Sequence, residues 1–100
     1  MKIDLKPNEV VVKASDSKHI NGQGDIQGKL ILTNQRVYFK SPEHNTYNME
    51  IMPSDIEEVI YFNTSMFCSN GLNIVTKEGS QLKFKIKKRD SWGKAINQMY

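Results

Sequence analysis

The chain has 100 residues, of which 38% are hydrophobic and 25% charged, with a formal net charge of +3. That length suits one domain, so residues 1–100 are expected to form a single unit with a modest core. The longest apolar run, residues 59–62, is far shorter than the roughly 20 residues of a membrane-spanning helix. The charged N-terminus lacks the apolar segment of a signal peptide, and with Cys68 as the single cysteine no internal disulfide can form. The sequence therefore predicts a cytoplasmic protein.

Seven short apolar runs predict β-strands. In the stretch GKLILTNQRVYFKS, apolar and polar residues alternate on both sides of the turn Thr33-Asn34-Gln35, which is typical of a hairpin. Valine-rich, aromatic or leucine-rich runs of similar length occur before and after it. The predicted strands are 9–14, 29–32, 36–40, 47–51, 56–62, 72–76 and 82–86. The glycine-containing segment 15–27 is expected to be a mobile connection.

A helix is predicted at the C-terminus. Asp90 is a plausible N-cap, and Trp92, Ala95 or Ile96, and Met99 then recur at helical spacing. Seven strands and one amphipathic helix favour a small sandwich or barrel whose open end is covered by the helix 90–100.

The hairpin over residues 28–41 resembles the signature of GRAM domains, a Gly-x-Leu-apolar-Leu-Thr-x-x-Arg-apolar-x-Phe pattern. The residues that match it are Gly28, Leu30, Leu32, Thr33, Arg36, Val37 and Phe39. Later residues that resemble the family's following strand, final strand and helix start are Ile56, Val59, Leu82, Phe84, Arg89 and Trp92. The similarity extends over roughly residues 8–99 and is strongest over 28–41 and 82–92.

The resemblance implies a pleckstrin-homology-like barrel of seven antiparallel strands capped by one C-terminal α-helix, similar to the small single-domain members found in bacteria. It also implies a binding module and not an enzyme. Several GRAM domains bind phosphoinositides or other anionic lipids, and others bind proteins.

Positive charge is concentrated in the last quarter of the chain. Residues 1–76 carry seven basic and nine acidic side chains, whereas residues 77–100 carry seven basic and two acidic side chains. Three lysines alternate with apolar residues in the last strand and so share its outer face, and two basic residues follow. The predicted residues for binding an anionic lipid or an acidic partner are Lys83, Lys85, Lys87, Lys88 and Arg89. The alternative is a solvated face whose lysines protect an edge strand from aggregation.

An apolar tip is predicted in the connection 63–71. Met66 and Phe67 are large apolar residues in an otherwise polar loop, and if exposed they could insert into a membrane or a groove of a partner. The alternative is that both pack back onto the rim of the barrel. Each lysine near an anionic membrane contributes about 1 kcal/mol, so the lysine stripe alone would bind weakly and would need such an anchor.

Four further basic residues are secondary candidates: Lys13, Lys18, Lys29 and Arg36. Around Lys18 the connection also holds Asp16 and Asp25, a mixture that disfavours a specific inositol phosphate pocket. Arg36 lies just after the hairpin turn, where it could bond a loop carbonyl or a carboxylate such as Asp55, or bind an anion.

The sequence shows no catalytic or metal-binding constellation. His19 and His44 both fall in predicted loops and share no metal-ligand spacing with Cys68. No cofactor is implied, and nucleic-acid binding is not expected because no aromatic residue lies between the charges of the lysine stripe. We therefore predict a non-enzymatic module that binds an anionic phospholipid surface or an acidic protein, peripherally at the membrane in the first case. The alternative is a protein-interaction or self-assembly module, including a homo-oligomer, that pairs through an exposed strand edge.

Overall fold

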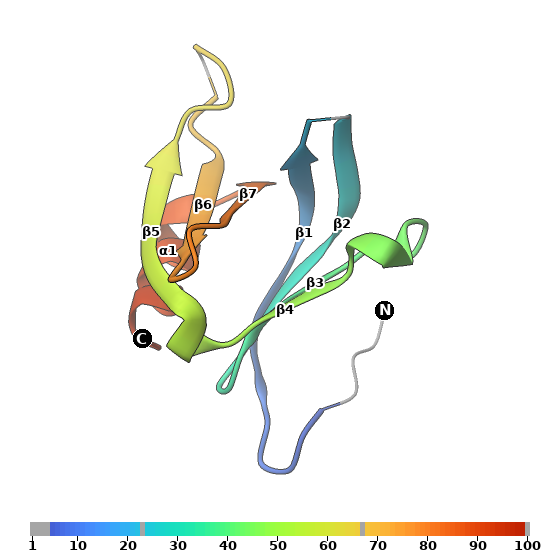
Figure 1. The fold of residues 1–100 in the computed structure, drawn as a ribbon, viewed down its shortest axis with the longest axis vertical. Helices are drawn as coiled ribbons and strands as arrows, with labels where there is room; N and C mark the ends of the chain where they lie inside the picture. The colour runs from blue at the N-terminus through green and yellow to red at the C-terminus, as the bar shows by residue number, and fades with distance from the viewer. Residues whose placement is uncertain (1–4, 23, 67, 100) are drawn as a thin grey trace.

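The computed structural model describes residues 5–22, 24–66 and 68–99. Seven antiparallel strands are followed by one α-helix (Figure 1). In chain order they are β1 (Val11–Asn21), β2 (Gly24–Thr33), β3 (Val37–Lys40), β4 (Met49–Ile51), β5 (Ile56–Phe62), β6 (Gly71–Thr76), β7 (Gln81–Ile86) and α1 (Arg89–Asn97). Short 3₁₀ turns at Asn45–Tyr47 and Pro53–Asp55 lie on either side of β4. The described part of the chain contains no helix long and apolar enough to span a bilayer.

The strands form one curled sheet in the order β4-β3-β2-β1-β7-β6-β5. β4 and β5 are its two edges and do not pair with each other in the part of the chain that is described, so the sheet is a half-barrel and not a closed one. The strong curl is visible in Figure 1, where β1 and β2 face β5 and β6 across the interior, and α1 packs against β5 and β6. The predicted seven-stranded fold with one C-terminal helix is confirmed.

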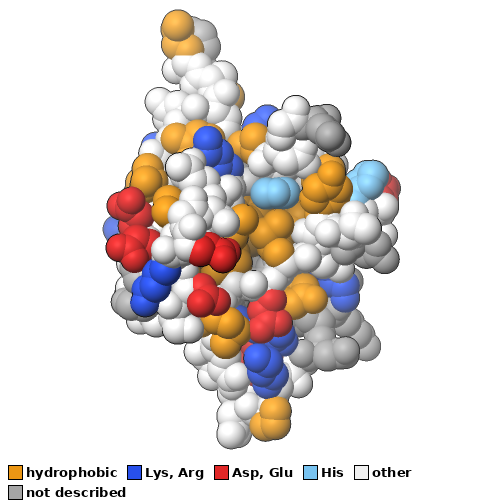
Figure 2. Space-filling model, in the orientation of Figure 1, with side chains coloured by type: hydrophobic (Ala, Val, Ile, Leu, Met, Phe, Trp, Pro, Cys, Tyr) orange, Lys and Arg blue, Asp and Glu red, His pale blue; other side chains and the backbone are white. Residues whose placement is uncertain are grey.

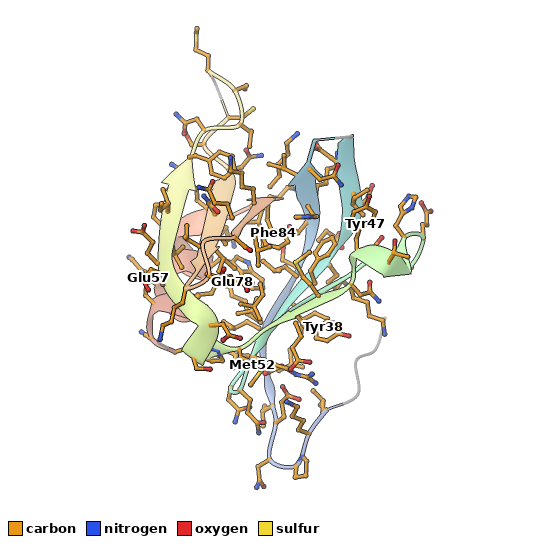
Figure 3. All side chains as sticks on the ribbon, viewed as in Figure 1. Tyr38, Tyr47, Met52, Glu57, Glu78 and Phe84 are labelled. Atoms are coloured by element: carbon orange, nitrogen blue, oxygen red, sulfur yellow. The ribbon has the colours of Figure 1, made fainter. Side chains whose placement is uncertain are left out.

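The core fills the inside of this curl. Alternate residues of the strands point inward, and α1 adds the fully buried Trp92 and Ile96. Figure 3 shows Phe84 inside the curl and Glu57, an exposed residue of β5, pointing away from it. The core residues are Leu30, Leu32, Val37, Phe39, Ile51, Ile56, Leu72, Ile74, Phe84, Ile86, Trp92 and Ile96.

The prediction of a mobile connection over 15–27 was wrong. β1 continues to Asn21, and β2 begins at Gly24, so this segment is most of a long hairpin. Polar residues replace apolar packing on its inner side. The Ser17 hydroxyl donates to the carbonyl of Lys85 at 2.9 Å, and His19 Nδ1 lies 3.1 Å from the carbonyl of Lys83. His19 is therefore a buried strand residue and not a loop residue.

The start of the helix also differs from the prediction. α1 begins at Arg89, and the residue before it is Lys88, whose backbone is left-handed with φ 57° and ψ 45°. Asp90 lies in the first turn, where its charge suits the positive end of the helix dipole, but its side chain does not cap the helix.

Arg36 forms a buried ion pair that ties the N-terminal segment to the turn between β2 and β3. Its Nε lies 2.8 Å from Glu9 Oε2, and its Nη1 lies 2.9 Å from Glu50 Oε2. The Thr33 hydroxyl donates to the same Glu9 oxygen and accepts the backbone N–H groups of Gln35 and Arg36. The predicted carboxylate partner of Arg36 is thus confirmed, with Glu9 and Glu50 in place of the suggested Asp55.

We expect Glu9→Gln to destabilise the fold in a pH-dependent way. The hydrogen bond from Arg36 lowers the pKa of Glu9 from 4.5 to about 2. Glu9 therefore stabilises the fold fully above pH 4.5, by about 3 kcal/mol, and loses this contribution as the pH falls toward 2. Urea unfolding followed by Trp92 fluorescence should show a loss of about 3 kcal/mol at neutral pH, a loss that shrinks between pH 4.5 and 2.

Glu57→Gln, which removes an exposed carboxylate, is the matched control and should change the unfolding free energy little at any pH. A constant difference between wild type and Glu9→Gln from neutral pH to pH 2 would contradict the role of the Glu9 charge.

Candidate anion-binding face

The outer side of β3, β2, β1 and β7 brings lysines from four strands together. Directly paired residues of an antiparallel sheet share a face, and Lys18 pairs with Lys85 between β1 and β7, while Lys29 pairs with Lys40 between β2 and β3. Asp16 and Lys18 are two residues apart on β1, and Asp16 pairs with Lys29, which joins the two sets. We call this surface the lysine face; it consists of Lys18, Lys29, Lys40, Lys83 and Lys85.

The two lysines of β7 have partners within the fold. Lys85 Nζ lies 2.6 Å from Asp25 Oδ2, and both side chains are about one-third exposed. Lys83 Nζ lies 5.8 Å from the centre of the Phe62 ring, a cation–π contact. These contacts hold both side chains against the outer surface of the sheet. The positive charge that is not compensated within the fold therefore comes from the neighbouring lysines.

Four other lysines on and next to this face have no ion-pair partner among the described residues. In the described ranges, Lys18, Lys29, Lys87 and Lys88 form no ion pair. Lys18 lies opposite Lys85, and like charges directly opposed across a sheet repel each other. Asp25 already offsets the charge of Lys85, so the positive charge left for an anion here is that of Lys18 and of Lys87, which line the same cavity.

The loop after β5 begins beside the lysine face. Asn70 at its base lines a cavity of about 210 Å³ together with Lys18, Lys85 and Lys87. The loop is braced by backbone hydrogen bonds from Thr64 N–H to the Cys68 carbonyl and from Cys68 N–H to the Ser65 carbonyl. It projects beyond the sheet, as Figures 1 and 2 show, and its Met66 is 87% exposed. Phe67 lies outside the described residues.

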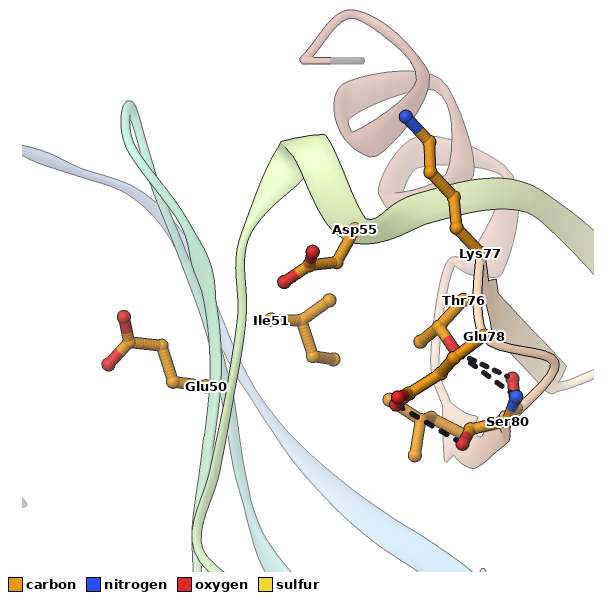
Figure 4. Close-up of a pocket in the computed structure, with 8 residues that line it drawn as sticks. Glu50, Ile51, Asp55, Thr76, Lys77, Glu78 and Ser80 are labelled. Carbon is orange, nitrogen blue, oxygen red and sulfur yellow. Dashed lines mark hydrogen bonds between the residues drawn. The ribbon is translucent and has the colours of Figure 1, made fainter.

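The concave side of the sheet has a different charge. A cavity of about 510 Å³ opens between β4 and the turn from β6 to β7 (Figure 4). Ile51 and Leu82 form its apolar part, and Figure 2 shows acidic side chains around this side of the molecule. Its charged residues are Glu50, Asp55, Lys77 and Glu78. The carboxylates here disfavour an anionic ligand, so the lysine face is the better candidate of these two surfaces.

Comparison with known proteins decides the family. The model of the GRAM domain matches residues 1–100. The chain belongs to the GRAM domain family. Members of this family are typically non-catalytic binding modules. No curated protein matches the sequence.

Solved structures similar to this GRAM domain show the pleckstrin-homology-like fold. The C-terminal domain of an unknown protein from Leishmania infantum has a TM-score of 0.81 and 17% identity, covering 93% of this chain and 85% of that one. The Vps36 N-terminal PH domain has a TM-score of 0.72 and 17% identity, covering 95% and 81%. The Slm1 PH domain in complex with inositol 4-phosphate has a TM-score of 0.67 and 12% identity, covering 89% and 96%. None of these matches supports a bacterial type, which stays a prediction.

The predicted basic residues of the GRAM domain fall into three groups. Lys83 and Lys85 lie on the lysine face with Lys18 and Lys29, and β7 is an inner strand, so its lysines do not protect an edge. Lys87, Lys88 and Lys13 line a separate cavity at the end of β7. Arg36 and Arg89 are both engaged in the fold.

Arg89 connects α1 to the end of β5. Its Nη1 donates to the carbonyl of Phe62 at 2.6 Å, and its guanidinium lies 5.2 Å from the centre of the Tyr61 ring. The Tyr61 hydroxyl in turn lies 3.4 Å from the carbonyl of Asp90. These contacts give Arg89 a structural role, which the sequence did not indicate.

The sequence analysis did not predict that Lys40 belongs to the lysine face, nor that Lys18 lies next to the lysines of β7. The signal that could have revealed this strand was the alternation of side chains with a period of two in residues 15–27. Asp16, Lys18 and Ile20 lie on one side of the strand, and Ser17 and His19 lie on the other. Because its inward residues are small or polar, this strand shows no apolar periodicity in the sequence.

We expect Arg89→Lys to lower the stability of the GRAM domain by about 1 kcal/mol and to leave its binding to anionic vesicles unchanged. Lysine keeps the charge but loses the planar fork that bonds the Phe62 carbonyl and stacks on Tyr61. Urea unfolding and vesicle co-sedimentation measure the two effects. Weaker vesicle binding with unchanged stability would show instead that Arg89 contacts the lipid.

Proposed function

We propose that this GRAM domain binds an anionic membrane surface through its lysine face, with the loop around Met66 as an apolar anchor. The observation that carries the proposal is the pairing of Lys18 with Lys85 across two central strands, next to the unpaired Lys87. Asp25 compensates Lys85 but neither Lys18 nor Lys87, and an anionic partner would attract these two remaining charges.

The estimated binding energies favour a weak contact with the membrane that needs both the lysines and the apolar anchor. The four unpaired lysines would each contribute about 1 kcal/mol near an anionic leaflet, which gives a roughly millimolar affinity. Burial of the Met66 side chain would add about 2 kcal/mol, bringing the dissociation constant to the order of tens of micromolar. Apolar outer-face residues of β5 near Lys83, namely Ile60 and Phe62, would add to the contact.

A diffuse anionic surface fits this face better than a single headgroup. Asp16 and Asp25 lie among the lysines and would repel a phosphate bound directly between them. The Slm1 PH domain has been solved with inositol 4-phosphate and with phosphoserine, so an anionic ligand is compatible with this fold.

Pairing through a strand edge is the second candidate. β5 is an edge strand of seven residues, and its Ile60 and Tyr61 are each 40% exposed. An added strand of a partner or of a second copy would be held mainly by backbone hydrogen bonds, which ionic strength affects little. β4 is also an edge but has only three residues.

We expect the double variant Lys18→Glu/Lys87→Glu to lose binding to anionic vesicles. Both lysines are exposed and unpaired, so charge reversal removes attraction without breaking an ion pair of the fold. The variant should bind at least tenfold more weakly in co-sedimentation with vesicles that contain phosphatidylglycerol, and wild-type binding should weaken as salt rises.

Lys77→Glu/Lys94→Glu is the matched control, because it makes the same change in net charge at exposed lysines away from the lysine face. Equal losses in the two double variants would contradict a localised site. Absence of wild-type binding at low salt would overturn the membrane proposal, and sedimentation of a salt-resistant dimer would favour pairing through β5.

We expect Met66→Ser to weaken vesicle binding by about tenfold without lowering stability. The side chain is 87% exposed, so the folded protein loses no packing, whereas the membrane complex loses its apolar anchor. Val10→Ser is the control, since Val10 is 60% exposed and lies beside Asn34 at the turn between β2 and β3. If both variants bind like the wild type, the loop is no anchor.

A further inference from the structure

We infer that the cavity between β1 and the corner that joins β7 to α1 binds a phosphate group. This inference rests on the proposed function in that it adds a selective subsite to a domain that binds anionic surfaces. The cavity has a volume of about 290 Å³. Its lining residues are Lys13, Ala14, Ser15, Lys87, Lys88 and Trp92.

The charge of this cavity differs from that of the other cavities described above. Three of its lining residues are lysines, and no carboxylate is among its described lining residues. The cavity beside Asn70 contains Asp16, the concave one contains three carboxylates, and a third, near Lys29, contains Asp16 and Glu43. Three lysines around one space suit a compact anion with several oxygens and up to two negative charges, which a phosphate monoester provides.

One wall of the cavity is a core residue, and another is an open strand edge. Trp92 is 1% exposed and belongs to the core, and the Lys13 ammonium lies 5.9 Å from its ring centre. β1 pairs with β7 only from Ser17 to Ile20, so the preceding stretch that carries Lys13 and Ser15 has no strand on that side. The backbone edge of β1 is therefore open to a ligand there, and the Ser15 hydroxyl, which donates to the Asp16 carbonyl at 3.3 Å, can turn to a phosphate oxygen instead.

Lys88 adds a separate argument from its backbone. Its φ of 57° lies in the left-handed region, which is unfavourable for residues with a β-carbon and is usually occupied by glycine. A lysine at this corner weakens the fold relative to glycine while adding a third lysine to the cavity lining. Strained backbone of this kind clusters at binding and active sites.

The test is a titration of the full chain with glycerol 3-phosphate and with inorganic phosphate, observed by ¹H–¹⁵N NMR. Trp92 is the only tryptophan, so its indole N–H gives a single reporter inside the cavity wall. We expect saturable shifts of this signal and of the Ser15 and Lys88 amides. Glycerophosphocholine, a phosphodiester without net charge, should produce no such shifts.

Two variants at one position separate charge from strain. Lys88→Gln and Lys88→Gly should each weaken phosphate binding by about fivefold, because both remove an ammonium group. Only Lys88→Gly should raise Tm, by a few degrees, because it also relieves the left-handed backbone. Lys18→Gln on the lysine face is the control and should leave phosphate binding unchanged.

Unsaturable shifts spread over all lysines, or unchanged binding in both Lys88 variants, would overturn the inference.

Binding to vesicles identifies the source of the phosphate and separates this inference from the proposed function. Preference for phosphatidic acid over phosphatidylglycerol at matched surface charge, lost in Lys88→Gln, would assign the site to a lipid phosphomonoester. Saturable phosphate binding without vesicle binding would support the site for a free phosphate while overturning the membrane proposal. Equal vesicle binding to both lipids without phosphate shifts would overturn the site alone.

Discussion

The register of β1 against its two neighbours determines which side chains share the outer face of the sheet. β1 pairs with β2 on one side and β7 on the other. Inside the curl, Ser17 and His19 bond the backbone carbonyls of Lys85 and Lys83, and these contacts fix the alignment from which the lysines point outward. A slip of one residue would turn Lys18 into the core and leave two carbonyls without partners. The interior therefore sets the charge pattern of the exterior.

The two arginines and the lysines perform different tasks. Arg36 and Arg89 are the only arginines in the sequence, and both make directed hydrogen bonds, to the Glu9 and Glu50 carboxylates in one case and to the Phe62 carbonyl in the other. A rigid, planar guanidinium suits such fixed geometry, whereas a flexible ammonium suits a diffuse anionic partner. The cations left for binding are accordingly lysines.

The sequence was sufficient for the fold class because the hairpin over 28–41, the strand count and the helix spacing all depend on local patterns. It was insufficient for the binding face, because that face depends on pairing between distant strands. Lys18 meets Lys85 only through the β1–β7 register. Arg36 and Arg89 resembled binding residues in the sequence, and only their partners, Glu9 and the Phe62 carbonyl, reveal their structural roles. The residue type predicts that a side chain is positively charged, but only its tertiary contacts show whether that charge is available to bind a ligand.

The separation of charge across the half-barrel also bears on how a bound domain would be oriented. The lysines point outward from the convex side of the sheet, whereas Asp55 and Glu78 line the cavity on the concave side. An anionic surface attracts the first side and repels the second, and both effects fall off within a Debye length of about 8 Å. With the convex side held against the surface, the concave cavity and the free edge of β4 would face away from it. One charge pattern would thus bind the domain and leave its opposite side accessible to a second partner.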